Sequence, residues 1–409
     1  MSNSAVIAGV GMTTFGKHLD RGLKSLGAEA IHLALADAGI EPNDIEAAWV
    51  GNAAAGLITG QESIRGQVVL RSLGIGGIPV INVENACASG STAFHQATAL
   101  VNAGAYDCVL ALGMEKLFHE DKKRSFAAFS GAVDVEAMAE IKAGLESHAA
   151  ESGAGTAASG AGKKRSLFMD IYAAAARSYM AKYGTTVEQL AAVSAKNSRH
   201  GALNERAQFR EALTIEDVLS SPLIAEPLTR PMCSPIGDGA AAVVIVSPAK
   251  AASLGLTDPV RLRACILRSG EDSQAGGDAA AKAAQQAYEV AGIGPDDLDV
   301  IECHDASAPA ELKAYDALGL CAVGDSGPLV ESGATALGGR IPVNPSGGLL
   351  RKGHPVGATG LAQLVELTEQ LQGRSGARQV EGARIALAHN GGGALGHDVA
   401  AMCVTVLSR

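Results

Sequence analysis

The sequence predicts a layered α/β fold built from two related halves, and three observations support this fold class. Short runs of β-branched and apolar residues alternate with alanine-rich helical stretches, as is typical of layered α/β domains. One segment recurs in the second half of the chain, which indicates a duplicated unit. The chain has 409 residues, of which 47% are hydrophobic, and is therefore long enough for two or three domains with a large core.

The expected elements alternate along the chain. We expect strands at 5–10 and 47–52 on either side of a helix at 25–38. A strand at 79–83 then leads into a helix at 89–102. The remaining expected strands are at 108–113 and at 240–246, the latter introduced by a Gly-Asp-Gly turn.

The internal duplication is the most informative feature of the chain. The sequence AGIEPNDI at 38–45 recurs as AGIGPDDL at 291–298, which is 253 positions later. Each copy follows an alanine-rich helix and precedes an expected strand. The two strands end at matching places, GNA at 51–53 and HDA at 304–306. Both halves are therefore expected to contain the same supersecondary unit.

A second, weaker repeat pairs a cysteine with a histidine. The sequences CASGST, starting at Cys87, and HPVGAT, starting at His354, both have glycine at the third following position and threonine at the fifth. Each is followed by an expected helix and strand. Two similar halves would place Cys87 and His354 in pseudo-symmetric positions.

The duplication suggests domain boundaries. We assign residues 1–113 and 237–256 to an N-terminal half and residues 257–409 to a C-terminal half. Residues 114–236 fit neither copy, and we expect them to form an inserted loop domain over the catalytic core. Within this insertion, the small-residue stretch at 149–162 is predicted to be a flexible loop, and a helix is predicted at 170–183.

Composition excludes several classes of partner. With 33 basic and 43 acidic side chains, the formal net charge is −10, which argues against binding to the phosphate backbone of nucleic acid. No apolar stretch approaches the ~20 residues of a membrane span, and the N-terminus lacks a secretory pattern. The seven cysteines show no metal-type spacing and are expected to be reduced thiols. We therefore expect a cytoplasmic protein with no metal, nucleic-acid or membrane partner.

Cys87 is a candidate nucleophile because it lies between an expected strand and an expected helix. The unpaired amides and positive end of a helix stabilise a thiolate and lower the pKa of the thiol. The alternative is a buried cysteine that packs as a small hydrophobic residue.

His354 is a candidate base because it lies in a segment rich in glycine and proline, at 344–360, just before an expected helix. Such an irregular backbone is costly unless it positions a group. A histidine held there can remove the proton of a thiol. The alternative is a capped helix with a solvent-facing histidine.

Four segments together resemble the active-site loops of the thiolase superfamily. Within this superfamily, they resemble the sterol-carrier-protein-type thiolases and their bacterial and archaeal acetyl-CoA acetyltransferase-like relatives. The segments are NACASG at 85–90, HDA at 304–306, GHPVGATG at 353–360 and HNGGG at 389–393, in the order of that family. The sequence FMDIY at 168–172 also resembles the loop domain of this branch.

The resemblance implies a five-layered fold of two βαβαβαββ halves, a loop domain that contacts coenzyme A, and a homodimer or a dimer of dimers. It implies a β-ketoacyl-CoA thiolase that cleaves or forms a β-keto acyl-CoA through a thioester on Cys87. Acyl-CoA and coenzyme A would then be substrates, with no bound cofactor.

The resemblance also assigns roles to site residues. His354 would be the base that generates the thiolate, and His304 would donate to the thioester oxygen. The backbone amides of Cys87 and Gly391 would form a second oxyanion hole. Each preorganised donor of this kind is worth ~3 kcal/mol or more.

One departure from the family concerns a second cysteine, which carries the proton of the α-carbon. The family has it at the position of His389 or, in the sterol-carrier branch, of Ala306, and neither is cysteine here. Cys303 is close, but it precedes His304 on a strand, where adjacent side chains point to opposite faces. His389 is the better candidate for the proton shuttle. Its alternative role is a neutral donor that orients the loop.

Two other functions remain open. Cys87, His304 and His354 form a Cys-His-His set like that of ketoacyl synthases, which would suit a thiolase-like condensing enzyme or acyltransferase. The chain could also be a thiolase-fold subunit that is active only with a zinc-ribbon/OB-fold partner, as in benzoylsuccinyl-CoA thiolase. Any zinc would then belong to the partner.

Two short motifs have simpler interpretations. GGGALG at 391–396 matches a dinucleotide-binding pattern, but a strand-like run follows it instead of a helix, so we reject that function. Lys163, Lys164 and Arg165 could attract the phosphates of coenzyme A, or they could form an exposed solvated cluster.

Overall fold

A nine-stranded sheet lies at the centre of the fold. The computed structural model describes residues 4–152, 165–257, 259–271 and 278–409. The strands of the sheet are β1 (Val6–Met12), β2 (Ala47–Gly51), β3 (Val80–Val83), β4 (Cys108–Glu115), β7 (Gly239–Val246), β8 (Val260–Arg268), β9 (Val300–Glu302), β10 (Ile385–Gly392) and β11 (Ala401–Ser408). Their spatial order is β3-β2-β4-β7-β1-β8-β11-β10-β9.

The sheet consists of two halves with the same strand pairings. In the first half β1, β7, β4 and β2 follow one another across the sheet, and β8, β11, β10 and β9 do so in the second. Val343 pairs in parallel with Ile301 of β9, at the position that β3 occupies beside β2. Within the described strands, the half-sheets are joined by two residue pairs between β1 and β8, Val6 with Arg261 and Ile7 with Val260. The duplication predicted from the sequence is therefore confirmed.

The repeated AGI segment ends a helix in each half. Helices α1 (Leu23–Ala38) and α11 (Ala279–Ala291) are each followed by a glycine, Gly39 or Gly292, whose φ is 67°. This left-handed conformation is one that glycine adopts without the strain of a Cβ atom. A short 3₁₀ helix follows each glycine and leads into the next strand.

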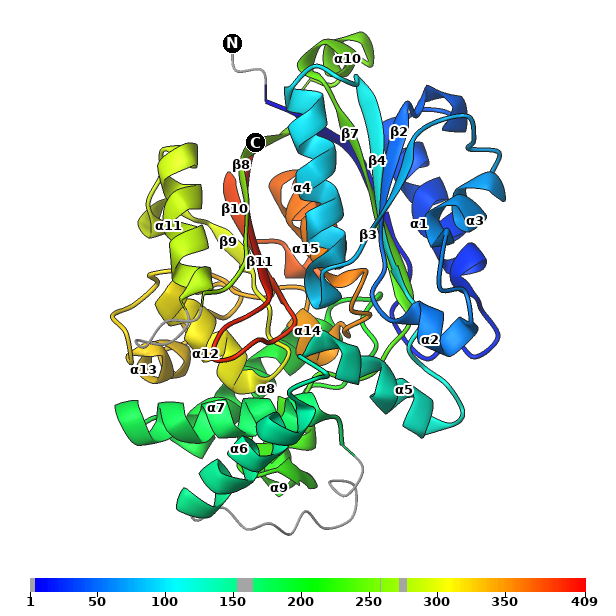
Figure 1. The fold of residues 1–409 in the computed structure, drawn as a ribbon. Helices are drawn as coiled ribbons and strands as arrows, with labels where there is room; N and C mark the ends of the chain where they lie inside the picture. The colour runs from blue at the N-terminus through cyan, green and yellow to red at the C-terminus, as the bar shows by residue number, and fades with distance from the viewer. Residues whose placement is uncertain (1–3, 153–164, 258, 272–277) are drawn as a thin grey trace.

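The helices and the two half-sheets form five layers (Figure 1). On one outer side, α1 and α3 (Arg65–Arg71) pack on the first half-sheet. On the other, α11 and α12 (Ala308–Ala317) pack on the second half-sheet. The central layer is α4 (Ser89–Asn102) and α15 (Thr359–Leu371), whose apolar side chains contact strands of both halves. The predicted α/β class and layered architecture are confirmed.

The elements expected from the sequence all form, with boundaries that shift by up to three residues. The helix expected at 89–102 matches α4, and the strand expected at 108–113 extends to Glu115. The helix expected at 170–183 begins earlier, as α7 (Leu167–Tyr183). The remaining described α-helices outside the insertion are α2 (Ala55–Thr59), α10 (Pro248–Ser253), α13 (Ser326–Glu331) and α14 (Gly348–Arg351).

The segment between β4 and β7 adds helices at one end of the sheet (Figure 1). Besides α7 they are α5 (Lys122–Phe129), α6 (Met138–Glu151), α8 (Val187–Ala202) and α9 (Ile215–Ser220), with a small hairpin of β5 (Leu223–Ala225) and β6 (Leu228–Thr229). Although the insertion lies between strands of the first half, Ala176 and Val193 share a core with Leu312 of the second half. The domain boundaries given above stay a prediction.

The small-residue stretch predicted as a loop is only partly described. Helix α6 continues through Glu151, so the first residues of 149–162 are helical and the loop prediction is wrong there. Residues 153–164, which include Lys163 and Lys164, lie outside the described residues. Among the described helices, none combines the length and apolar character needed to cross a membrane.

Candidate active site

Cys87 lies on a strained turn between β3 and α4. The turn is a 3₁₀ helix, Ala86–Ala88, and Ala86 has a φ of 47°, which is unfavourable for a residue with a Cβ atom. The end of β10 packs tightly against this turn, because a Cβ on Gly392 would lie 2.2 Å from the carbonyl oxygen of Asn85. The strain is thus held by packing from the other half of the molecule.

The two glycines of the weaker repeat allow the starts of α4 and α15 to meet. A Cβ atom on Gly90 would lie 2.7 Å from the carbonyl oxygen of Gly357. Gly113 makes an equally close approach to the same carbonyl. Any larger residue would push the Cys87 and His354 segments apart, so the repeat has a direct structural function.

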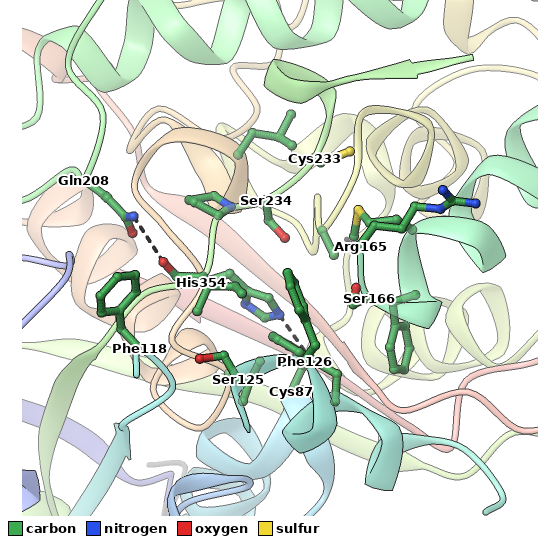
Figure 2. Close-up of a pocket in the computed structure, with 18 of the residues that line it drawn as sticks. Cys87, Phe118, Ser125, Phe126, Arg165, Ser166, Gln208, Cys233, Ser234 and His354 are labelled. Atoms are coloured by element: carbon green, nitrogen blue, oxygen red, sulfur yellow. Dashed lines mark hydrogen bonds between the residues drawn. The ribbon is translucent and has the colours of Figure 1, made fainter. Parts of the chain in front are cut away.

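His354 contacts Cys87 across the interface between the halves. Its Nε2 lies 3.2 Å from the Cys87 Sγ (Figure 2). Its Nδ1 lies 2.7 Å from the Thr359 hydroxyl. The Thr359 hydroxyl donates to the Pro355 carbonyl at 3.1 Å, so it accepts from Nδ1 of the ring. The proton of the neutral ring is therefore on Nδ1, and Nε2 is free to accept the thiol proton.

His304 lies two residues after the end of β9 and is the third member of the cluster. Its ring meets that of His354 edge-on, with 5.2 Å between centroids. Its Nδ1 lies 3.0 Å from the Asn390 side-chain amide, and Asn390 in turn accepts a hydrogen bond from Ser91. Because Nδ1 accepts, Nε2 carries the proton and is available as a donor.

The three side chains form a compact set. One ligand-type atom from each of Cys87, His304 and His354 lies within 4.8 Å of the others. A thiol and two imidazoles at this spacing could also bind a thiophilic metal ion. Both ring nitrogens of His354 have a partner, Thr359 and the thiol, whereas His304 is bonded at Nδ1 only and keeps Nε2 as an available donor.

Burial keeps Cys87 and His354 neutral. Burial raises the pKa of the Cys87 thiol to about 12, and the negative charge of Glu115 adds to this effect. Burial also lowers the pKa of His354 to about 3 and that of His304 well below its usual value. The expectation that the helix start lowers the thiol pKa is therefore wrong. Loss of water outweighs the favourable amides, among them Gly393, which hydrogen-bonds the sulfur.

A cavity of about 910 Å³ opens in front of this pair (Figure 2). Its wall is strongly aromatic, since five of the seven phenylalanines of the chain line it. They are Phe118, Phe126, Phe129, Phe168 and Phe209. Most of the lining residues come from the segment between β4 and β7, so this segment and the two halves together enclose the space in front of Cys87.

His389 and Gly391 lie on β10, behind His304. His389 is buried, its Nδ1 accepts from the backbone amide of His304 at 3.3 Å, and its Nε2 has no partner among the described residues. Burial lowers the pKa of His389 to about 4. Gly391 pairs with Met402 on β11. The lining of the cavity includes neither residue, whereas Ala306 belongs to it.

The remaining thiols near the site differ in their access to the cavity. Cys303 is buried against Asn344, 3.4 Å from its side-chain amide, and does not line the cavity. Cys233 does line the cavity and was not singled out from the sequence. It lies beside Ala306, because the backbone amide of Ser234 donates to the Ala306 carbonyl at 3.1 Å.

Glu115 is a buried carboxylate that sequence reasoning missed. It accepts hydrogen bonds from the side chain of Asn52, from the amides of Ala53 and Ala54, and from the amide of Gly357 at 3.0 Å. It thereby ties the end of β2 to the His354 segment. Burial raises its pKa to about 7. The only signal in the sequence was an acidic residue two positions beyond an expected strand.

Known protein families match both parts of the chain. Residues 5–249 match the family "Thiolase, N-terminal domain", and residues 269–408 match "Thiolase C-terminal domain-like". The chain belongs to the thiolase family. As a member of this family, it is an acyltransferase of the thiolase type. The recognition made from the four loop segments is therefore confirmed.

Several relatives of this thiolase match along its length. An acetyl-CoA acetyltransferase of Methanothermobacter thermautotrophicus is 39% identical, with 96% of this chain and 97% of the relative covered. Human sterol carrier protein 2 is 38% identical, with 94% and 69% covered. The benzoylsuccinyl-CoA thiolase subunit BbsB of Thauera aromatica is 36% identical, with 96% of both chains covered.

Two solved structures share the fold. The structure titled "Ltp2-ChsH2(DUF35) aldolase" has a TM-score of 0.77 at 23% identity, covering 99% of this thiolase and 98% of that chain. Human mitochondrial 3-ketoacyl-CoA thiolase has a TM-score of 0.72 at 17% identity, with the same coverage. At these identities the likeness supports the fold alone.

Proposed function

We propose that this protein is a β-ketoacyl-CoA thiolase in which Cys87 carries the acyl group. The observation that carries the proposal is the contact between the Cys87 thiol and His354 Nε2 at the cavity wall. A cysteine paired with a base that has its own hydrogen-bond partner is the arrangement that nucleophilic catalysis requires.

The first half-reaction forms the thioester. His354 Nε2 takes the thiol proton as the Cys87 sulfur attacks the β-carbonyl carbon of the substrate. The bond between the α- and β-carbons then breaks, the acyl group stays on the sulfur, and the departing acetyl-CoA takes a proton at its α-carbon. Because both groups are neutral before attack, the proton moves during bond formation rather than in advance.

The second half-reaction transfers the acyl group to coenzyme A. The thiol of coenzyme A loses its proton and attacks the thioester carbonyl, and Cys87 leaves and regains a proton from His354. His304 Nε2 is suited to donate to the thioester oxygen of the substrate. The amides of Cys87 and Gly391 are proposed for the second oxyanion hole, and the Gly393 amide is a further donor beside the sulfur.

A further group must carry the proton of the α-carbon. His389 is our candidate, and its buried Nε2 without a described partner is consistent with a donor. Its contact with the His304 amide also fits the alternative role of orienting that loop. Both roles are compatible with a pKa of about 4, since the ring is neutral at physiological pH.

Coenzyme A is the proposed acyl acceptor. The cavity is lined by six basic side chains, namely Lys17, Lys122, Arg165, Arg210, Arg230 and Arg351, against two acidic ones, Glu84 and Glu211. This positive excess contrasts with the net charge of −10 of the whole chain. It supports binding of phosphate groups at the mouth of the cavity. Of the predicted basic cluster at 163–165, only Arg165 is described, and it pairs with Asp170.

The assembly and cellular location are proposals as well. We propose a homodimer, since β3 forms an edge of the sheet that a second copy could cover. A small partner protein is also proposed, because the relative BbsB is named as a subunit. The described cysteines are all free, which supports a reducing, cytoplasmic location.

A second candidate function is a condensing enzyme or acyltransferase with a Cys-His-His site. It is favoured by the edge-on contact of His304 with His354. A panel of acetoacetyl, branched, aryl and dicarboxylic β-keto acyl-CoAs, assayed with and without added coenzyme A, separates the two. Coenzyme A-dependent cleavage supports the thiolase. Acyl transfer to another acceptor without it supports the alternative, and activity only with co-purified proteins supports a partner.

A further inference from the structure

Arg351 is a buried cation without a carboxylate partner. Five lysine and arginine residues of the described chain are buried, and four of them form an ion pair with a carboxylate. Those pairs are Lys116 with Asp238, Lys196 with Glu311, Lys352 with Glu302, and Arg378 with Glu366. Arg351, with 6% of its surface exposed, is the exception within the described part of the chain.

The contacts of Arg351 leave part of its guanidinium unused. One Nη2 hydrogen bond goes to the backbone carbonyl of Glu211 at 2.5 Å, and the guanidinium carbon lies 5.4 Å from the centre of the Phe209 ring. Its Nε is buried and has no hydrogen-bond partner among the described residues. A guanidinium has five N–H donors, so these neutral contacts satisfy only a small part of its capacity.

The backbone is shaped to hold this side chain. A Cβ atom on Gly201 would lie 2.8 Å from the Arg351 Cβ, and one on Gly347 would lie 3.2 Å from it. Two glycines from different segments therefore make the room that Arg351 occupies. The segment at 208–209 fixes it further, since the Phe209 amide donates to the Arg351 carbonyl at 3.0 Å.

The position of Arg351 connects it to the site. It ends α14, three residues before His354, and it lines the same cavity as Cys87 and His354. Taking a charge out of water is costly unless an opposite charge compensates it. Of the two acidic residues that line the cavity, Glu211 is the one whose charge acts on Arg351, and it is exposed and forms no ion pair with Arg351 in the described chain.

We propose that Arg351 is the binding site for an anionic group of the substrate, which completes the missing ion pair when the cavity is occupied. This inference rests on the proposed function. The ligand chemistry is a carboxylate or phosphate oxygen pair, which a guanidinium binds through two parallel hydrogen bonds. The anion has two possible sources, a carboxylate at the far end of the acyl chain or a phosphate of coenzyme A.

The experiment compares wild-type enzyme with Arg351→Met and Arg351→Lys on three matched substrates. They are a β-keto acyl-CoA whose chain ends in a carboxylate, its methyl ester, and the pantetheine thioester of that ester, which lacks the phosphates of coenzyme A. If Arg351 binds the acyl carboxylate, Arg351→Met loses roughly 10- to 100-fold in kcat/KM on the acid only. If Arg351 binds a phosphate, Arg351→Met loses this factor on both coenzyme A thioesters, the acid and the methyl ester. Its kcat/KM on the pantetheine thioester is then unchanged.

Stability provides the second measurement, because a purely structural role makes the opposite prediction. Arg351→Met removes an uncompensated buried charge and should leave the Tm unchanged or raise it. The control Arg378→Met breaks a buried ion pair and should lower the Tm. Equal activity losses of Arg351→Met on all three substrates, no loss on any, or a Tm that falls together with activity would each overturn the inference.

Failure of the proposed function is distinguishable from failure of the anion site. A wild-type enzyme that cleaves none of the three thioesters argues against the thiolase proposal. Calorimetric titration of wild-type and Arg351→Met with coenzyme A, pantetheine and a free dicarboxylate then still decides on Arg351. A dissociation constant unchanged by the substitution for all three would overturn the anion site.

Discussion

His354 Nε2 lies 3.2 Å from Cys87 Sγ, although the two residues are 267 positions apart in the chain. The contact exists because α4 and α15, equivalent helices of the two halves, begin side by side in the central layer. Close approach of Gly90 to the Gly357 carbonyl allows it. A duplicated fold thus gives one nucleophile and one base from the same structural position in each copy.

The hydrogen bond from His354 Nδ1 to Thr359 fixes which ring nitrogen faces Cys87. Thr359→Val removes the acceptor and allows the ring proton to move from Nδ1 to Nε2. A protonated Nε2 cannot accept the thiol proton. We expect kcat to fall roughly tenfold, corresponding to about 1–1.5 kcal/mol, with little change in KM. Thr359→Ser, which keeps the hydroxyl, should restore most of the activity. Equal losses in both variants would contradict the assigned tautomer.

The raised thiol pKa predicts how Cys87 reacts with a neutral alkylating agent. Only the thiolate reacts, and with a pKa of about 12 its fraction rises tenfold for each pH unit below that value. Iodoacetamide labelling of the Cys87 peptide, followed by mass spectrometry, should therefore accelerate continuously from pH 6 to about pH 10. A plateau beginning below pH 8 would instead reveal a preformed thiolate–imidazolium pair. Labelling of Cys87→Ala gives the background.

Glu115 should couple stability to pH. Its pKa of about 7 in the folded protein is above the ordinary value of 4.5, so folding favours the protonated carboxyl. Its contribution to stability is complete below about pH 4.5 and is lost as the pH rises through 7. Urea unfolding of wild-type and Glu115→Gln at pH 5 and pH 8 measures this contribution. Between these pH values the free energy of unfolding should fall more in the wild type than in the variant, which has no titrating group at this position.

The same substitution should weaken the site. The amides of Ala53, Ala54 and Gly357 and the Asn52 side chain all donate to Glu115, and glutamine has only one acceptor oxygen. At pH 8, where Glu115 is ionised and both of its oxygens accept, we expect a lower kcat in the variant, because these donors lose an acceptor worth about 1–3 kcal/mol. The exposed Glu188→Gln serves as control. An unchanged kcat in Glu115→Gln would show that the His354 segment does not depend on this carboxylate.

His389 is tested by deuterium exchange into the α-carbon of acetyl-CoA. If its imidazole carries this proton, His389→Ala should slow exchange by about 100-fold or more while Cys87 is still acylated. Exchange at the wild-type rate would assign His389 to orienting the His304 loop. The thiol of Cys233 and the phenol of Tyr172, which both line the cavity, would then be the next groups to replace.

Much of the fold was predictable because its signals are local. The helix-ending glycines Gly39 and Gly292 and the alternation of strands with helices lie within short windows of sequence. The repeat carried the prediction of paired halves. The shared core of the insertion and the C-terminal half, through Ala176 and Leu312, was not predictable, because it depends on contacts between distant segments.

The clustering of three site residues was predictable from the sequence, but their electrostatics were not. Cys87, His304 and His354 were identified from their motifs, and the structure brings them together. The direction of the thiol pKa shift was wrong, because desolvation depends on how the insertion covers the cavity, which no motif encodes. Glu115 and Arg351 could not be identified from the sequence. The importance of Glu115 depends on its hydrogen bond with the distant Gly357 amide, and that of Arg351 on its lacking an ion pair such as that of Arg378 among the described residues.

The most direct test of acyl transfer through Cys87 is to trap the thioester. Enzyme mixed with a β-keto acyl-CoA in the absence of free coenzyme A is quenched in acid, digested and examined by mass spectrometry. The thiolase proposal predicts a hydroxylamine-sensitive acyl group on the Cys87 peptide and none on that of Cys87→Ala, which should also be inactive. An acyl group on another residue, or full turnover by Cys87→Ala, would contradict it.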